Sequence, residues 1–188
     1  YPILTIPVAV ILAWLIGMAV LGWTALRRAL RLQVIARQAG CASGFMQGVF
    51  RYCRNSMSVH VGVCLKVSSK VESPVVWGIW QPVILLPHDF ASRFGSRGLR
   101  AVLLHQFARI KNGDLRINFL QVVMQIVWFF NPLIWLANGR IRALRSCLAN
   151  ELVLEAMDNR LPWYPETLAD MAAPAAENPG LTAALIGV

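Results

Sequence analysis

Charged residues are scarce in this sequence, and acidic residues are the scarcest of them. Only 14% of the 188 residues are charged, with 9 Asp and Glu against 18 Lys and Arg, whereas about a quarter of the residues of a soluble domain are charged. From Tyr1 to Leu26 there is no charge at all. This deficit argues against an ordinary soluble domain and indicates contact with lipid.

The sequence also lacks an initiator methionine, since it starts at Tyr1, and it stops within an apolar stretch. We therefore expect a fragment of a longer protein. Its length allows one domain with a real core, and two at most.

Paired cysteines are absent as well. The four cysteines form no CxxC pair and have no regular spacing, which disfavours a disulfide framework. We expect them to be reduced and packed, as in a domain that faces the cytoplasm. A metal site that combines them with His60 is the weaker alternative, because the spacings are irregular. The cysteines are Cys41, Cys53, Cys64 and Cys147.

The positive charge is concentrated directly after the first apolar run, and no acid occurs before Glu72. A basic cluster beside an apolar span marks the cytoplasmic side of a membrane, with anionic lipid headgroups as its partner. A nucleic-acid surface is the alternative for a net charge of +9, but no binding motif accompanies the charge, and no nucleic acid is expected. The cluster comprises Arg27, Arg28, Arg31, Arg37, Arg51, Arg54, Lys66 and Lys70.

Two charge-free runs are long enough to cross a membrane. The first is 3–26, where a transmembrane helix fits better than a signal peptide because the basic residues follow the apolar run. The second is 117–138, which lies between Arg116 and Arg140. A membrane helix is favoured there over a buried soluble helix, although the Asn131-Pro132 pair inside it would kink or break a helix.

The remaining segments have the pattern of a small α+β domain. Valine-rich or proline-punctuated stretches predict short strands, and apolar residues at helical spacing predict helices. The expected elements are a helix over 27–39, a loop over 40–48, a strand over 59–67, two strands within 74–87, a helix from Ser92 or Ser96 to Gly113, a helix over 140–157 and an irregular tail.

The segment His105-Gln106-Phe107-Ala108-Arg109 has the spacing of a zincin helix but not its chemistry. A zincin needs two histidines at i and i+4 to hold Zn²⁺, and a glutamate after the first to act as general base. Here Gln106 cannot accept a proton at any useful pH. Arg109 is permanently cationic and has no lone pair for a metal.

The surroundings of this helix resemble the membrane metallopeptidase family of the BlaR/MecR type, the antirepressor sensor-transducers. The runs that carry the resemblance are ESPVVWGIWQPVILLPHDF, LLHQFARIKNGDL, WFFNPLIWL and LRSCLANELVL, in that order. The likeness covers roughly residues 60–157, with the first apolar span also in register. It implies a zincin-type fold with two membrane helices.

The resemblance also assigns positions on the helix and just after it. His105 matches the first metal ligand, Gln106 replaces the catalytic glutamate, and Arg109 replaces the second histidine. Asp114 matches the family's aspartate after the zincin motif. Ser146 stands where a glutamate ligand is expected.

Asn150 stands where an aspartate is expected one turn after Ser146. A zinc site needs about three protein ligands, so we expect no metal, no cofactor and no catalytic residue. Four other residues could in principle rebuild a site, but Glu151 projects from a different face than Ser146. These four are His60, His88, Asp89 and Glu151.

Arg109 itself allows two interpretations. It could replace the metal's positive charge by pairing with Asp114 or Glu151. Alternatively, its side chain could extend to water or to lipid headgroups.

The sequence therefore predicts an α+β protein in which about two membrane helices bracket a small zincin-like cytoplasmic domain, with a short β-sheet and a degenerate zincin helix. The expected divisions are a transmembrane helix at 1–26, a cytoplasmic region at 27–116, a transmembrane or membrane-embedded helix at 117–138, and a cytoplasmic helix with an irregular tail at 139–188.

The favoured function is a catalytically inactive pseudo-metallopeptidase that serves as a binding, scaffold or structural subunit of a membrane protein complex. It would lie in the bacterial cytoplasmic membrane, with basic loops toward the cytoplasm and another membrane protein as partner. One alternative is a signal-transducing, antirepressor-like sensor whose sensor domain would lie beyond Val188. The second alternative is an active zinc metallopeptidase.

Overall fold

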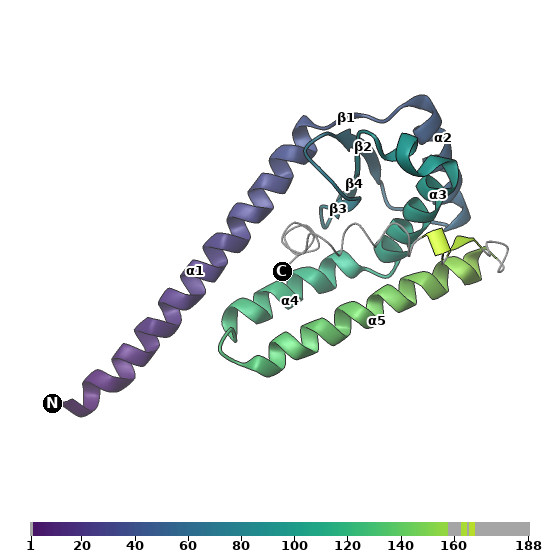
Figure 1. Cartoon of the computed structure of the whole chain (residues 1–188). Helices are drawn as coiled ribbons and strands as arrows, with labels where there is room; N and C mark the ends of the chain where they lie inside the picture. The colour runs from purple at the N-terminus through teal and green to yellow at the C-terminus, as the bar shows by residue number, and fades with distance from the viewer. Residues whose placement is uncertain (1, 158–162, 165, 168–188) are drawn as a thin grey trace.

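The computed structural model describes residues 2–157, 163–164 and 166–167. A long helix, α1 (Pro2–Gln38), leads into an α+β domain, and a pair of helices lies beside both (Figure 1). The two expected segments 3–26 and 27–39 thus form one continuous helix. Among the described residues, α1 is the one helix that is long and apolar enough to cross a membrane, and no part of its most apolar stretch is buried.

The sheet has four strands in the order β1-β2-β4-β3. Strands β2 and β4 pair in parallel, and the two outer strands pair antiparallel to them. The two strands expected within 74–87 are present, whereas the strand expected over 59–67 begins later. The strands are β1 (Gly40–Cys41), β2 (Cys64–Ser68), β3 (Val75–Trp77) and β4 (Val83–Pro87).

A helix that the sequence analysis missed, α2 (Gly44–Ser56), follows β1. The prediction of a loop over 40–48 was wrong. The glycines in this segment do not interrupt the helix, whose buried apolar face is formed by Met46, Phe50 and Cys53. Ser43 caps the helix by accepting a hydrogen bond from the backbone N–H of Met46, as serine does at an N-cap.

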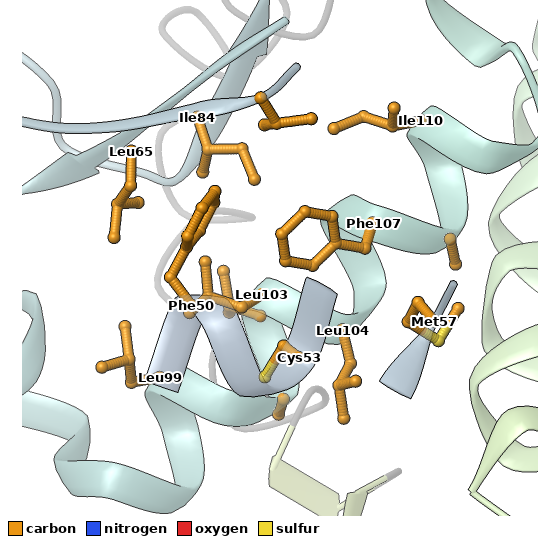
Figure 2. Close-up of a cluster of buried hydrophobic side chains, with 14 of the residues drawn as sticks. Phe50, Cys53, Met57, Leu65, Ile84, Leu99, Leu103, Leu104, Phe107 and Ile110 are labelled. Atoms are coloured by element: carbon orange, nitrogen blue, oxygen red, sulfur yellow. The ribbon is translucent and has the colours of Figure 1, made fainter. Parts of the chain in front are cut away.

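The core lies where α2 and the helix α3 (Phe90–Lys111) pack against the sheet. The rings of Phe50 and Phe107 meet with their centroids 5.2 Å apart, and Leu65 and Ile84 reach the same cluster from β2 and β4 (Figure 2). This core fixes the face of α3 that carries the residues singled out by the sequence.

The cysteines are free, as expected, but they are not all packed. Cys53 is fully buried in the core, whereas Cys41, Cys64 and Cys147 are exposed. Burial raises the pKa of the Cys53 thiol to about 12. Cys53 is therefore a packing residue and not a reactive thiol.

The charge-free run 117–138 is not one helix. It divides into α4 (Asp114–Val127) and the start of α5 (Pro132–Ala156), which run side by side in opposite directions (Figure 1). Pro132 stands in the first turn of α5, where its ring is tolerated, and Asn131 caps that helix through the backbone N–H of Leu133. A second membrane helix over 117–138 is therefore not confirmed, and the helix expected over 140–157 is the distal part of α5.

Candidate functional site

Helix α3 presents His105 toward α5, and the following segments close around it. The imidazole Nδ1 lies 3.0 Å from Oδ1 of Asn150 and 3.4 Å from the hydroxyl of Tyr164. The Tyr164 hydroxyl in turn donates to Asn150 Oδ1 at 3.3 Å. Residues from three parts of the chain therefore meet at one ring nitrogen.

The environment keeps His105 neutral. Burial, assisted by the positive charge of Arg109 and opposed by the hydrogen bond with Asn150, lowers the pKa of His105 to about 4. Burial also raises the pKa of Tyr164, which is fully buried. At physiological pH this cluster is a network of uncharged hydrogen bonds.

Asn150, and not Ser146, is the α5 residue that contacts His105. Ser146 is exposed one helical turn earlier. In metal sites, an oxygen acceptor commonly orients a ligating histidine through the ring nitrogen that does not bind the metal. Asn150 has this geometry, because it engages Nδ1.

Arg109, one turn after His105, forms an ion pair with Asp114. Its Nε lies 3.3 Å from Oδ2 of Asp114, whose side chain is only 3% exposed. Of the two interpretations of Arg109, pairing with a carboxylate is the one present, and the partner is Asp114, while Glu151 is exposed. Gly113, with φ of 72°, lets the chain turn from α3 into α4 and so brings Asp114 back to Arg109.

A second arginine, Arg145 of α5, reaches the same place and is itself buried. Its Nη1 donates to the backbone carbonyl of Asp114 at 3.0 Å, and its Nη2 donates to Gln121 Oε1. The polar contacts continue along the α4–α5 interface, where Gln121 donates to Asn138 at 3.2 Å and Asn138 donates to Gln125 at 3.3 Å. Two guanidinium groups thus converge on one acidic residue.

These residues do not fit a zinc ion. No three His, Cys, Asp or Glu side chains in the described part of the chain lie close enough together to hold a metal. A guanidinium stands one turn from His105, and Gln106 is buried with its Oε1 unpartnered among the described residues. The candidates for a rebuilt site do not help, since all are exposed. They are His60, His88, Asp89 and Glu151.

Sequence reasoning missed two members of this site. Tyr164 lies in the proline-containing tail, where no periodicity signals burial. Arg145 does have a signal in the sequence. It is an arginine among apolar residues of a helix, and a buried arginine needs a polar partner. The rest of the expected tail falls on residues 158–162, 165 and 168–188, which lie outside the described residues.

The chain combines a long exposed apolar helix with an α+β domain whose central helix carries a histidine. These features define the class of protein: an α+β domain that follows an apolar helix long enough to cross a membrane. Residues 2–183 match the family described as BlaR1 peptidase M56, and the chain belongs to that family.

Individual relatives agree with this assignment at low identity. The regulatory protein BlaR1 of Bacillus licheniformis is 28% identical over 149 residues, which cover 79% of this chain and 25% of the relative. The methicillin resistance mecR1 protein of Staphylococcus aureus is 22% identical over 129 residues, covering 68% of this chain and 22% of the relative. The chain thus spans about a quarter of the length of these relatives.

Proposed function

We propose that this chain is the membrane-bound M56 region of a signal-transducing protein of the BlaR/MecR type, and that it passes on a signal by protein contact and not by peptide hydrolysis. The absence of peptide hydrolysis is inferred from the Arg109–Asp114 ion pair. This pair occupies the helix turn where a zincin has its second metal ligand. A cation held there repels a divalent metal and supplies no lone pair.

The positive charge has a structural role in this proposal. Arg109 on α3 and Arg145 on α5 both hold Asp114 at the start of α4. Arg109 pairs with the buried carboxylate and Arg145 bonds the backbone carbonyl of the same residue. Removing either partner of the buried ion pair leaves an uncompensated charge, so the pair ties its elements together strongly. The two arginines therefore replace a bound metal as the link between the helices.

Signalling is favoured over the scaffold subunit that the sequence analysis ranked first. The relatives carry the names of a regulatory protein and of a methicillin resistance protein, which support the signalling alternative. In this role α1 crosses the membrane with its basic end toward the cytoplasm, because arginines begin at Arg27, where the apolar run ends.

The test is a cellular response in three strains that carry the full-length gene, the gene deletion, or the His105→Ala variant. Because one relative is a methicillin resistance protein, the stimulus is methicillin, and the readout is the change in transcript levels. We expect the response to be lost in the deletion strain and kept with His105→Ala. An unchanged response in the deletion strain would contradict the signalling role. If His105→Ala loses both the response and a peptidase activity of the native protein, the protein acts as an enzyme.

A further inference from the structure

The hairpin of α4 and α5 returns to the side from which it starts. Its two helices are in register through Arg145, which contacts Asp114, and through Asn138, which contacts Gln121. No charged residue occurs from 117 to 139. The basic residues Arg116 and Arg140, which flank this run in the sequence, therefore both lie away from the turn, toward the open end of the hairpin.

The closed end of the hairpin lies against the middle of the apolar run of α1. The indole N–H of Trp14 donates to the carbonyl of Val127 at 3.0 Å. At Gly17, an added Cβ would lie 2.4 Å from Cζ of Phe129, so the Phe129 ring occupies the space that only glycine leaves. Gly17 is about 14 Å along the helix from Leu26, the last residue before the basic cluster, which is about half the 30 Å of a hydrocarbon core.

Several backbone polar groups at the turn between the two helices are paired within the protein. Trp135 Nε1 donates to the carbonyl of Phe129 at 3.0 Å, and the N–H of Asn131 donates to the carbonyl of Trp128 at 3.0 Å. Trp14 covers the carbonyl of Val127 in the same way. Hydrocarbon offers no hydrogen-bond partner, so backbone within it must be paired internally. One of these indole donors is local to the turn, whereas the other comes from α1, 113 residues away. A turn exposed to water would not need them, because water can bond its carbonyls.

The side chains of the hairpin separate by polarity. Large apolar residues point outward, while Gln121, Gln125 and Asn138 bond to one another between the helices. Amides between helices hold them together where lipid removes the hydrophobic drive for association. The outward residues, all more than half exposed, are Phe119, Leu120, Phe130, Leu133 and Leu136.

We infer that the α4–α5 hairpin is re-entrant: it enters the bilayer from the cytoplasmic side, turns near the midplane against α1, and leaves on the same side, with lipid acyl chains as its partner. The inference rests on α1 crossing the membrane, as in the proposed function. It replaces the single membrane helix expected over 117–138, and it keeps Arg145 and Asn150 on the same side as His105. A helix that crossed fully would carry these two residues to the opposite side.

Cysteine accessibility in the full-length protein tests this arrangement. The native cysteines are replaced by serine or alanine, and one cysteine is introduced at a time. Cells are treated with a membrane-impermeant maleimide before or after permeabilisation of the membrane. The four variants are Asn112→Cys at the end of α3, Arg140→Cys at the open end of the hairpin, Phe130→Cys at its tip and Pro2→Cys at the far end of α1.

We expect Asn112→Cys and Arg140→Cys to be labelled only after permeabilisation, and Pro2→Cys in intact cells. Phe130→Cys is expected to be unlabelled in both conditions but labelled in SDS, because its side chain is 64% exposed within the protein and only lipid covers it. Labelling of Arg140→Cys in intact cells, or of Phe130→Cys without SDS, overturns the re-entrant hairpin while α1 still crosses. Labelling of Pro2→Cys only after permeabilisation overturns the crossing of α1 as well, and with it the proposed membrane role.

Discussion

Arg109 Nε and Asp114 Oδ2 lie 3.3 Å apart across the turn between α3 and α4. The pair is only partly exposed on the arginine side and buried on the aspartate side, with side-chain exposures of 27% and 3%. It occupies the helix turn after His105 and connects to α5 through Arg145. Three helices are therefore joined at one residue, Asp114, whose carboxylate pairs with α3 and whose backbone carbonyl accepts from α5.

The first prediction concerns that carboxylate. Asp114→Asn removes the carboxylate that pairs with Arg109 and whose charge also favours the nearby Arg145 guanidinium. We expect the free energy of unfolding to fall by about 3 kcal/mol, as for other broken buried pairs. Thermal or denaturant unfolding in detergent measures it. The matched control is Asp89→Asn, which removes the exposed pair with Arg93 at 3.9 Å and should change stability by at most about 1 kcal/mol. Equal effects of the two substitutions would contradict a structural role for Asp114.

The second prediction is a pH dependence that His105 causes. Its pKa is about 4 in the folded protein and 6.5 in the reference state, so the unfolded chain binds the proton more readily. The contribution of the neutral His105 to the free energy of unfolding is therefore present above pH 6.5 and is lost as the pH decreases toward 4. At pH 5 the loss is up to about 2 kcal/mol.

Unfolding midpoints between pH 7.5 and 5 measure this effect. The slope should be reduced in His105→Gln and kept in His88→Gln, which alters an exposed histidine. A slope that survives His105→Gln would assign the effect to other groups.

The third prediction concerns the contact between α1 and the hairpin. Gly17→Val places a side chain where the Phe129 ring lies, and we expect a destabilisation of about 1–3 kcal/mol through overpacking. Gly22→Val makes the same change in the same helix, where nothing lies within 4 Å of the added Cβ. Since the helix propensities match, the difference between the two midpoints reports the contact alone. Equal midpoints would show that the hairpin does not dock at Gly17.

The fourth prediction concerns the turn of the hairpin. Trp135→Phe keeps an aromatic ring but removes the N–H that the carbonyl of Phe129 accepts. An unpaired carbonyl is more costly in lipid than in water. We therefore expect Trp135→Phe to destabilise the protein measurably in lipid nanodiscs if the turn lies in lipid. If the turn is exposed to water, the change in stability should be close to zero. Trp80→Phe, at an 83% exposed indole, is the control and should be neutral.

Local chemistry allowed much of the fold to be predicted. The charge-free run before Arg27 gave α1, the proline and glycine punctuation within 74–87 gave β3 and β4, and Gly113 marked the end of α3. Helix α2 was missed because its glycines looked like a loop. Hydropathy alone does not distinguish one span over 117–138 from a hairpin. The Asn131-Pro132 pair signals the break between α4 and α5, and the contacts of Trp14 and Gly17 place the turn against α1.

The site was predictable as a set of positions but not as a set of contacts. The resemblance placed His105, Arg109 and Asp114 in one region, and the pairing of Arg109 with Asp114 was one of the stated options. The contact of His105 with Asn150 in place of Ser146 depends on the rotation of α5. The resemblance marked both positions, and the packing of α5 against α3 decides that Asn150 and not Ser146 is the one in contact.

The zinc content of the purified full-length protein tests most directly whether the chain carries a hydrolytic metal centre. Elemental analysis after equilibration with zinc and removal of the unbound metal should find far less than one zinc per chain, with no difference between the native protein and His105→Ala. One zinc per chain that is lost in His105→Ala, together with cleavage of a peptide substrate, would contradict the account.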